Sequence, residues 1–458
     1  MYKKKYSIDM CSGPILPKLL RLVLPLMLSS ILQLLFHTAD IIVVGNFAGE
    51  NSLAAVGSTG SLVNMMTNLF LGLSVGTNVL TARYLGAKDS GNVSRTVHTA
   101  ISMSLISGVI LTLIGVIFAE KLLLLMQSPP EVLSLSALYL RIYFLGMIPM
   151  LIYNFGSSIL RAKGDTKRPL YFLTIAGVVN VALNLIFVIV WKMDVAGVAL
   201  ATVISQCISA IFILICLAKE TDGVKFSPKK LQLEGKIVRR ILQVGIPAGL
   251  EGVVFSLSNV VLQSSVNSFG AIVMAGCAAA ASIEGFVWMA MNAFSQGTLT
   301  FISQNMGAGK YGRINKILRT SLLCSGLTGL VLGNLAYLFG GSLVRIYDPR
   351  PEVVVPALTR MMYVGRLYFL CGLMDIVGCT VRGMGHPTAP TIVSLLGACG
   401  LRLLWILTLF QLPQFHTRGF LFMSYPVSWM ITLLAHITCF VIFRKRYPKE
   451  DAPSPLIT

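Results

Sequence analysis

The sequence predicts an all-α integral membrane protein, with twelve transmembrane helices in two six-helix lobes related by a parallel internal repeat. Of the 458 residues, 55% are hydrophobic and only 12% are charged, whereas a soluble domain has about 25% charged residues. Apolar stretches recur along the whole chain, and each has roughly the 20 residues that cross a hydrocarbon core about 30 Å thick. Backbone polar groups in lipid must be paired within their own segment, so we expect these stretches to be helices.

The predicted spans are separated by short polar loops, and they cover residues 19–44, 53–80, 96–118, 133–156, 168–190, 195–217, 240–269, 271–302, 317–339, 353–378, 388–411 and 417–443. Most of the 37 Lys and Arg residues lie before the first span, after the last one, or in the loops that follow even-numbered spans. This distribution follows the positive-inside rule and predicts a multi-pass protein with both termini in the cytoplasm. The net charge of +19 therefore reflects topology and contact with the lipid bilayer, and not a nucleic-acid partner.

Two loop motifs occur twice at a spacing of 221 residues. "YLGAKDSGNVSR" from Tyr84 matches "NMGAGKYGRINK" from Asn305, and "LRAKGDTKRP" from Leu160 matches "VRGMGHPTAP" from Val381. "LVLPLML" from Leu22 also matches "QVGIPAGL", at a spacing of 222. Each copy holds six spans, an even number, so both copies have the same orientation in the membrane.

The repeat predicts the domain organisation. We expect an N-terminal lobe over residues 1–217, a cytoplasmic connector loop over 218–239, a C-terminal lobe over 240–443 and a cytoplasmic tail over 444–458. The connector is basic and contains Gly and Pro, so we expect it to let the two bundles move relative to one another.

Asp40 is the most distinctive of the four acidic residues inside predicted spans. Gln33 and His37 precede it at helical spacing and give the first span one polar face. A charged side chain at the bilayer centre costs at least about 2.5–3.5 kcal/mol, so intramembrane acids are candidates for function. His37 fits either a hydrogen bond to a neighbouring span or a proton relay.

Amide and hydroxyl groups in two later spans are candidate partners for Asp40. Asn180 and Asn184 lie four residues apart on one face of the fifth span, and Thr202 adds a hydroxyl from the sixth. These oxygen donors suit Na⁺ and are equally able to hold a protonated acid. The pair Asn64 and Asn68 in the second span has the same spacing and fits either a cavity wall or contacts between helices.

The other three intramembrane acids, Glu251, Glu284 and Asp375, fall in the second half of the chain. They are candidates for binding a substrate, and the alternative is pairing with Arg141, Arg366 or Arg402, three arginines that also lie inside predicted spans. Glu284 precedes Trp288 and several methionines, a combination suited to a lipophilic cation. Pro25 and Pro247 each fall early in the first span of a lobe, where a proline permits either a mobile hinge or a static kink.

The chain resembles the multidrug and toxic compound extrusion family of secondary transporters. The resemblance rests on "LPLMLSSILQLLFHTADIIVVG" in the first span, the "LGA" loop, "SSILRAKGDTKRP", "GVALATVISQ" in the sixth span, and the second copies of the repeated motifs. It implies a two-lobed antiporter in the cell membrane that exports cationic or amphipathic organic compounds in exchange for inward H⁺ or Na⁺. No other cofactor is implied, and we expect a monomer.

The resemblance also suggests roles for individual residues. Asp40 would be the coupling acid, with Asn180 and Thr202 as partners, and these three could hold Na⁺. Members of this branch often carry a second aspartate where this chain has Asn184, so the identity of the coupling ion stays open. Comparable acids in other members imply a cavity role for Glu251 and Asp375.

Two alternatives to a drug exporter were considered. A flippase for lipid-linked oligosaccharides would have the same spans and lobes, but the repeated loop motifs favour the exporter. A membrane enzyme would need a catalytic cluster, and the chain contains no D-D-x-x-D, H-E-x-x-H, G-x-S-x-G or P-loop motif. We therefore expect no enzymatic activity.

Overall fold

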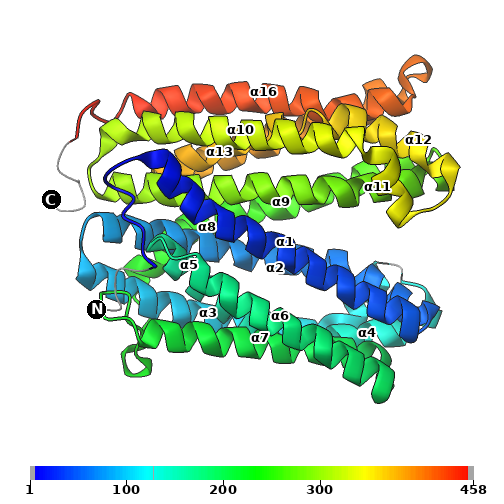
Figure 1. The fold of residues 1–458 in the computed structure, drawn as a ribbon, viewed down its shortest axis with the longest axis horizontal. Coiled ribbons are helices and arrows are strands. Elements are labelled where there is room, and N and C mark those ends of the chain that lie inside the picture. The colour runs from blue at the N-terminus through cyan, green and yellow to red at the C-terminus, as the bar shows by residue number, and fades with distance from the viewer. Residues whose placement is uncertain (1–5, 127, 452–458) are drawn as a thin grey trace. The chain divides into compact units, whose positions relative to one another are not determined.

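The computed structural model describes residues 6–126 and 128–451, and within these ranges the ordered elements are all helical (Figure 1). The α-helices are α1 Ile15–Phe47, α2 Glu50–Gly86, α3 Ser90–Leu125, α4 Pro130–Leu145, α5 Met147–Ala162, α6 Lys167–Leu185, α7 Asp194–Ala218, α8 Gly235–Asn267, α9 Ala271–Gly307, α10 Ile314–Leu338, α11 Gly340–Tyr347, α12 Pro351–Arg360, α13 Phe369–Gly383, α14 Thr388–Ser394, α15 Leu401–Leu407 and α16 Arg418–Arg444. Three π-helical segments, Ile186–Val190, Met361–Gly365 and Leu395–Gly400, extend or interrupt these helices.

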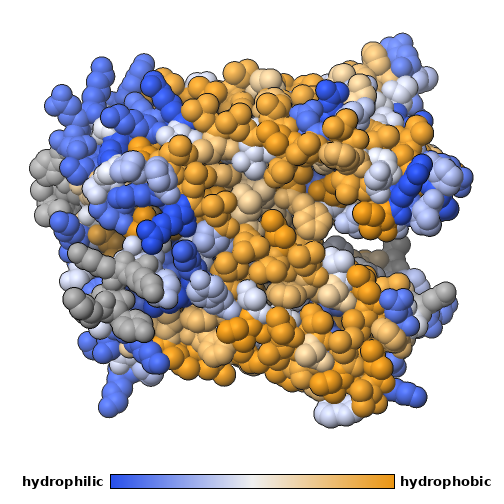
Figure 2. Space-filling view, in the orientation of Figure 1, coloured by the Kyte–Doolittle hydropathy of each residue, from blue (hydrophilic) through white to orange (hydrophobic). Residues whose placement is uncertain are grey.

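The helices account for the twelve predicted spans. Ten helices or continuous helical runs are long and apolar enough to cross a membrane, and α4 with α5 forms a further span that bends by 46°. Helix α2 has 37 residues, about 55 Å at 1.5 Å per residue. It corresponds to the remaining predicted span, residues 53–80, although Gly, Ser, Thr and Asn make it less apolar than the others. On the face shown in Figure 2, hydrophobic side chains cover the middle of the helices and hydrophilic ones gather at their ends.

The backbone repeats the sequence motifs at the same spacing of 221 residues. Gly49 and Gly270, which precede α2 and α9, have φ values of 86° and 91°. Gly164 and Gly385, after α5 and α13, have φ values of 89° and 105°. This left-handed region strongly favours glycine, so the predicted internal repeat is confirmed at the level of turn geometry.

The chain forms two compact units. The first unit consists of Met1–Asp9 and Leu28–Leu250. In it α5 packs against α2, α3 and α7, and α6 packs against α7. The second unit consists of Met10–Met27 and Glu251–Thr458. In it α13 packs against α9, α10 and α16, which is the same arrangement one repeat later (Figure 1).

These units differ from the predicted lobes at α1 and α8. Each helix begins in one unit and ends in the other, with the change after Met27 in α1 and after Leu250 in α8. Pro25 and Pro247 lie two and three residues before these changes. A proline inside a helix removes a backbone hydrogen bond, so both prolines lie at points where the helices are locally weakened.

Glycines let α8 approach α2 closely inside the first unit. A Cβ atom on Gly72 would lie 2.3 Å from the backbone nitrogen of Gly249, and one on Gly76 would lie 2.4 Å from the carbonyl oxygen of Ile241. Gly297 of α9 corresponds to Gly76 in the repeat and packs against Val23 of α1 in the second unit. A Cβ atom on Gly297 would lie 2.6 Å from a side-chain carbon of Val23. Small residues at such crossings are a common means of packing membrane helices.

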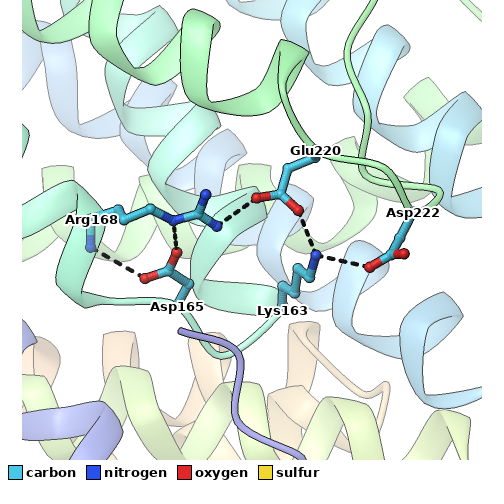
Figure 3. A network of polar contacts seen from close by, with 5 residues as sticks. All are labelled: Lys163, Asp165, Arg168, Glu220 and Asp222. Carbon is cyan, nitrogen blue, oxygen red and sulfur yellow. Dashed lines mark hydrogen bonds and ion pairs between the residues drawn. The ribbon is translucent and has the colours of Figure 1, made fainter. Parts of the chain in front are cut away.

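The connector is fixed to the first unit by ion pairs at its start. Lys163 donates to Glu220 at 2.6 Å and to Asp222 at 3.0 Å, while Arg168 contacts Glu220 at 2.6 Å and also pairs with Asp165 (Figure 3). Each cation in this network meets two carboxylates. The start of the connector is therefore held against the loop between α5 and α6.

The middle of the connector packs on α3. Phe226 stacks on the ring of His98 with centroids 5.7 Å apart, and the Ser227 amide donates to Nε2 of the same histidine at 3.0 Å. Val224 is fully buried. These apolar contacts and hydrogen bonds explain why the connector follows one path over the first unit.

Candidate functional site

A chain of polar side chains crosses the interior of the first unit. Asn184 of α6 donates a hydrogen bond from its amide nitrogen to Asp40 of α1. The same amide lies 3.4 Å from the oxygen of Asn180, and Asn180 in turn donates to the hydroxyl of Thr202 on α7 at 3.4 Å. The structure thus brings together four residues that the sequence proposed as one site.

A packing contact sets the position of Asp40 relative to α6. The ring of Phe36, one turn before Asp40, fills the space where Gly177 of α6 lacks a side chain, since a Cβ there would lie 1.9 Å from the ring. Asn180 and Asn184 follow Gly177 on the same face of α6. The π-helical segment Ile186–Val190 begins two residues after Asn184, and such segments are frequent at functional sites.

Asp40 has neutral neighbours. Within residues 6–126 and 128–451 no Lys, Arg or His forms an ion pair with it. The Oδ1 atom of Asn184 is buried and has no hydrogen-bond partner in this part of the chain, so an oxygen donor is available beside the carboxylate. A cation or a proton can therefore bind next to Asp40 without first displacing a basic side chain.

Two tyrosines near Asp40 were missed by sequence reasoning. Tyr139 and Tyr143 of α4 stack with ring centroids 5.7 Å apart. Both interact electrostatically with Asp40. Their spacing of four residues places them on one helix face. That spacing was a usable signal, but aromatic residues are too common in membrane spans for it to stand out.

Four other predicted residues lie outside this polar chain. Gln33 and His37 are exposed on α1, and no hydrogen bond joins either of them to Asp40 among the described residues. Asn64 is exposed and Asn68 half-buried on α2. Their helical spacing is as predicted, but the structure gives them no direct part in the Asp40 contacts.

Two of the three acids of the second unit pair with arginines. Arg382 of α13 donates through Nη2 to the carboxylate of Glu251 on α8. Asp375 lies seven residues before Arg382 on α13 and interacts electrostatically with both Arg382 and Glu251. The cluster therefore holds two acids and one arginine.

Glu284 of α9 pairs with Arg360 at the end of α12. The Nε and Nη2 atoms of the arginine donate to one carboxylate oxygen at 3.1 and 2.9 Å. The guanidinium also lies 5.7 Å from the ring centre of Tyr425. Trp288, one turn after Glu284, is 37% exposed.

The predicted arginine partners were wrong, because the pairs involve Arg360 and Arg382. Arg141 instead lies 3.4 Å from Glu120 at an exposed position. Arg366 donates to Asn334. Arg402 donates to Ser428 and lies 4.3 Å from the ring centre of Tyr425. Arg360 lies inside the predicted span 353–378 and Arg382 lies four residues after it, but neither was named as a partner from the sequence.

Comparison with known proteins places this geometry in a family. The family model described as MatE matches residues 25–186 and again residues 247–408, one copy in each half. The chain belongs to the MatE family. The two matches reproduce the internal repeat, and the MatE chain is accordingly a membrane protein.

Relatives of this MatE chain cover most of its length. It is 27% identical over 419 residues to the probable multidrug resistance protein YoeA of Bacillus subtilis (strain 168), covering 90% of each chain. It is 21% identical over 396 residues to the multidrug export protein MepA of Staphylococcus aureus (strain NCTC 8325 / PS 47), covering 86% of this chain and 88% of that one.

Solved structures share the fold. One, described as the outward-facing conformation of a multidrug resistance MATE family transporter of the MOP superfamily, superposes with a TM-score of 0.86 at 21% identity, covering 97% of this chain and 98% of the other. Another, of MATE in the bent conformation, has a TM-score of 0.84 at 22% identity and covers 94% of each chain.

Proposed function

We propose that the protein is a secondary antiporter of the cell membrane that exports cationic or amphipathic organic compounds in exchange for inward H⁺ or Na⁺. Family membership and the names of the relatives support multidrug export over a lipid-linked oligosaccharide flippase. No enzymatic activity is part of the proposal. We further propose that the protein acts as a monomer with both termini in the cytoplasm, in agreement with its Lys and Arg distribution.

The observation that carries the proposal is the environment of Asp40. Its carboxylate accepts a hydrogen bond from the amide of Asn184, which also contacts Asn180, and among the described residues no arginine pairs with it. An unpaired charge in the membrane interior is costly, so the site is more stable when Asp40 holds a proton or a small cation. Binding of the ion and its release on the other side of the membrane then change the charge of this unit.

The contacts define roles for the neighbouring groups. The oxygens of Asn180, Asn184 and Thr202 are hard donors that suit Na⁺. With a proton on Asp40 instead, the same oxygens can accept its hydrogen bond. We propose that Gln33 and His37, on the preceding turns of α1, line the path by which the ion reaches the carboxylate.

Alternating access requires the two lobes to rearrange about the bound substrate. We propose Pro25 and Pro247 as the hinges, since each lies where its helix passes from one compact unit to the other. Asp375, Glu251, Glu284 and Trp288 are proposed to attract the organic cation, together with Asn64 and Asn68. Substrate would have to compete with the arginines that now hold Glu251 and Glu284.

The test is efflux of a fluorescent organic cation from vesicles that contain the purified protein and an imposed pH or Na⁺ gradient. Asp40→Asn should abolish gradient-driven efflux, and the matched control Asp194→Asn, at an exposed position on α7, should retain it. Undiminished efflux in the Asp40 variant would remove the coupling role. Movement of a labelled lipid-linked sugar without movement of any organic cation would replace the exporter by a flippase.

A further inference from the structure

A groove at one end of the second unit combines a basic rim with an apolar floor. It has a volume of about 270 Å³ and lies where α10 begins and α16 ends. Its lining consists of Asn315, Leu318, Arg319, Phe440, Val441, Arg444 and Lys445. Three of these residues are cations, three are apolar, and none is acidic.

Among the residues that the structure describes, no carboxylate forms an ion pair with the cations of the groove. Among the described residues 6–126 and 128–451, neither Arg319, Arg444 nor Lys445 forms an ion pair, and the nearest such pair in sequence joins Lys310 to Asp451. Arg444 is held by neutral groups instead. Its Nε donates to Asn315 at 3.2 Å, and its Nη2 donates to the carbonyl oxygen of Tyr311 at 3.1 Å. These contacts fix the guanidinium in place and leave its charge uncompensated.

In the first unit, the region that corresponds to this groove in the repeat is covered by the connector. His98 corresponds to Arg319 and Val224 to Lys445 at the spacing of 221. There the connector covers the ends of α3 and α7, with Phe226 stacked on His98 and Val224 fully buried. In the described part of the second unit the start of α10 and the end of α16 line a groove instead, and an external molecule can take the place that the connector has in the first unit.

The surroundings of the groove indicate the kind of molecule. Leu323 and Leu327 of α10 are 66% and 59% exposed, and Leu434 of α16 is 57% exposed. These side chains lie on the membrane-spanning parts of the same two helices, one to four turns from the cations. A ligand that matches both features has an anionic head and apolar chains.

We propose that this groove binds the headgroup of an anionic phospholipid, with the acyl chains along the exposed leucines of α10 and α16. The phosphate accepts hydrogen bonds from Arg319 and Lys445, and Phe440 and Leu318 pack beneath the glycerol region. Basic pockets between helices on the cytoplasmic side are suited to such lipids. The proposal concerns a binding site away from Asp40 and does not depend on the transported substrate.

The test uses the full chain purified in detergent and native mass spectrometry with two phospholipids of identical acyl chains, phosphatidylglycerol and phosphatidylcholine. We expect the wild type to retain phosphatidylglycerol preferentially. Arg319→Gln/Lys445→Gln should weaken that retention at least about tenfold, since each cation near the membrane surface contributes about a fivefold preference for anionic lipid. Arg444 is left unchanged because it also holds backbone carbonyls.

Two further variants separate charge from folding. Lys229→Gln/Lys230→Gln removes two exposed cations from the connector and should leave retention unchanged. Arg319→Lys/Lys445→Arg preserves the charge and should retain the lipid, with the unfolding temperature as a check on all variants. Equal retention of both lipids, unchanged retention after Arg319→Gln/Lys445→Gln, or displacement of the lipid by millimolar inorganic phosphate would each overturn the proposal.

Discussion

The two units are built on the same repeat but place their intramembrane carboxylates at different positions and pair them differently. In the first unit Asp40 is bound by Asn184, and the corresponding residues of the second repeat are Leu262, at the first-span spacing of 222, and Trp405, at the spacing of 221. In the second unit Glu251 is bound by Arg382, and the residues one repeat earlier are Ser29 and Arg161. Each half therefore has the same fold but lacks the carboxylate of the other, while the arginine is present in both halves, as Arg161 and Arg382.

The partner of a buried carboxylate determines whether the carboxylate can exchange its bound ion. A carboxylate that faces an arginine stays ionised, because neutralising it would leave the arginine unpaired in the membrane. A carboxylate that faces amides can exchange its ion without exposing another charge. The comparison predicts that loss of partners will mainly destabilise the second unit and mainly alter ion use in the first.

The largest effect is expected from breaking the Glu284–Arg360 pair. Arg360→Met leaves a buried carboxylate without its partner, and removal of one member of a buried pair costs about 3–5 kcal/mol. The unfolding temperature of the purified protein in detergent should fall accordingly. The double variant Arg360→Met/Glu284→Leu should recover most of the loss, and failure to recover it would mean that packing of Arg360 on Tyr425, and not the ion pair, provides the stability.

A smaller loss of stability is expected when alanine replaces a glycine where two helices cross. The repeat places such a glycine in both units. In Gly76→Ala the new methyl group meets the backbone of α8 at 2.4 Å, which should cost about 1–3 kcal/mol because backbone cannot move aside easily. Gly297→Ala meets a valine side chain, which can rotate. Its cost should be largely offset by the roughly 1 kcal/mol that alanine gains over glycine in a helix. Equal unfolding temperatures for the two variants would contradict this distinction.

The sequence predicts the membrane spans well, but it predicts few of the contacts between the helices. Spans and repeat follow from hydropathy and helical spacing, which are local properties of the chain, whereas the assignment of Asn180 and Thr202 as partners of Asp40 came from the resemblance to the family. The pairing of Glu284 with Arg360 joins residues 76 positions apart, and no local pattern encodes it. The burial of Val224 and Phe226 in the connector could not be predicted from its composition, because it results from tertiary packing on the first unit.

A change of ion use is expected from Asn184→Asp in the first unit. The second carboxylate would face Asp40 and add one negative charge to the site, and binding of cations strengthens with the number of charged ligands. Na⁺ should then drive efflux at about tenfold lower concentration, measured as the half-maximal Na⁺ concentration in vesicles. An unchanged half-maximal concentration would show that Na⁺ does not bind beside residue 184.

The smallest effect concerns the ionic network that holds the connector, the element that the second unit lacks. Burial alone would raise the pKa of Glu220, but hydrogen bonds from Lys163 and Arg168 outweigh it and hold the pKa below its usual value of 4.5. A lowered folded-state pKa means that Glu220 stabilises the protein above pH 4.5, and that this contribution is lost as the pH falls through the folded-state value. Glu220→Gln should therefore lower stability by about 1 kcal/mol at neutral pH, and the difference from wild type should shrink in acid. A difference in unfolding temperature that stays constant from pH 7 to pH 3 would show that the carboxylate charge is not what holds the connector to the loop between α5 and α6.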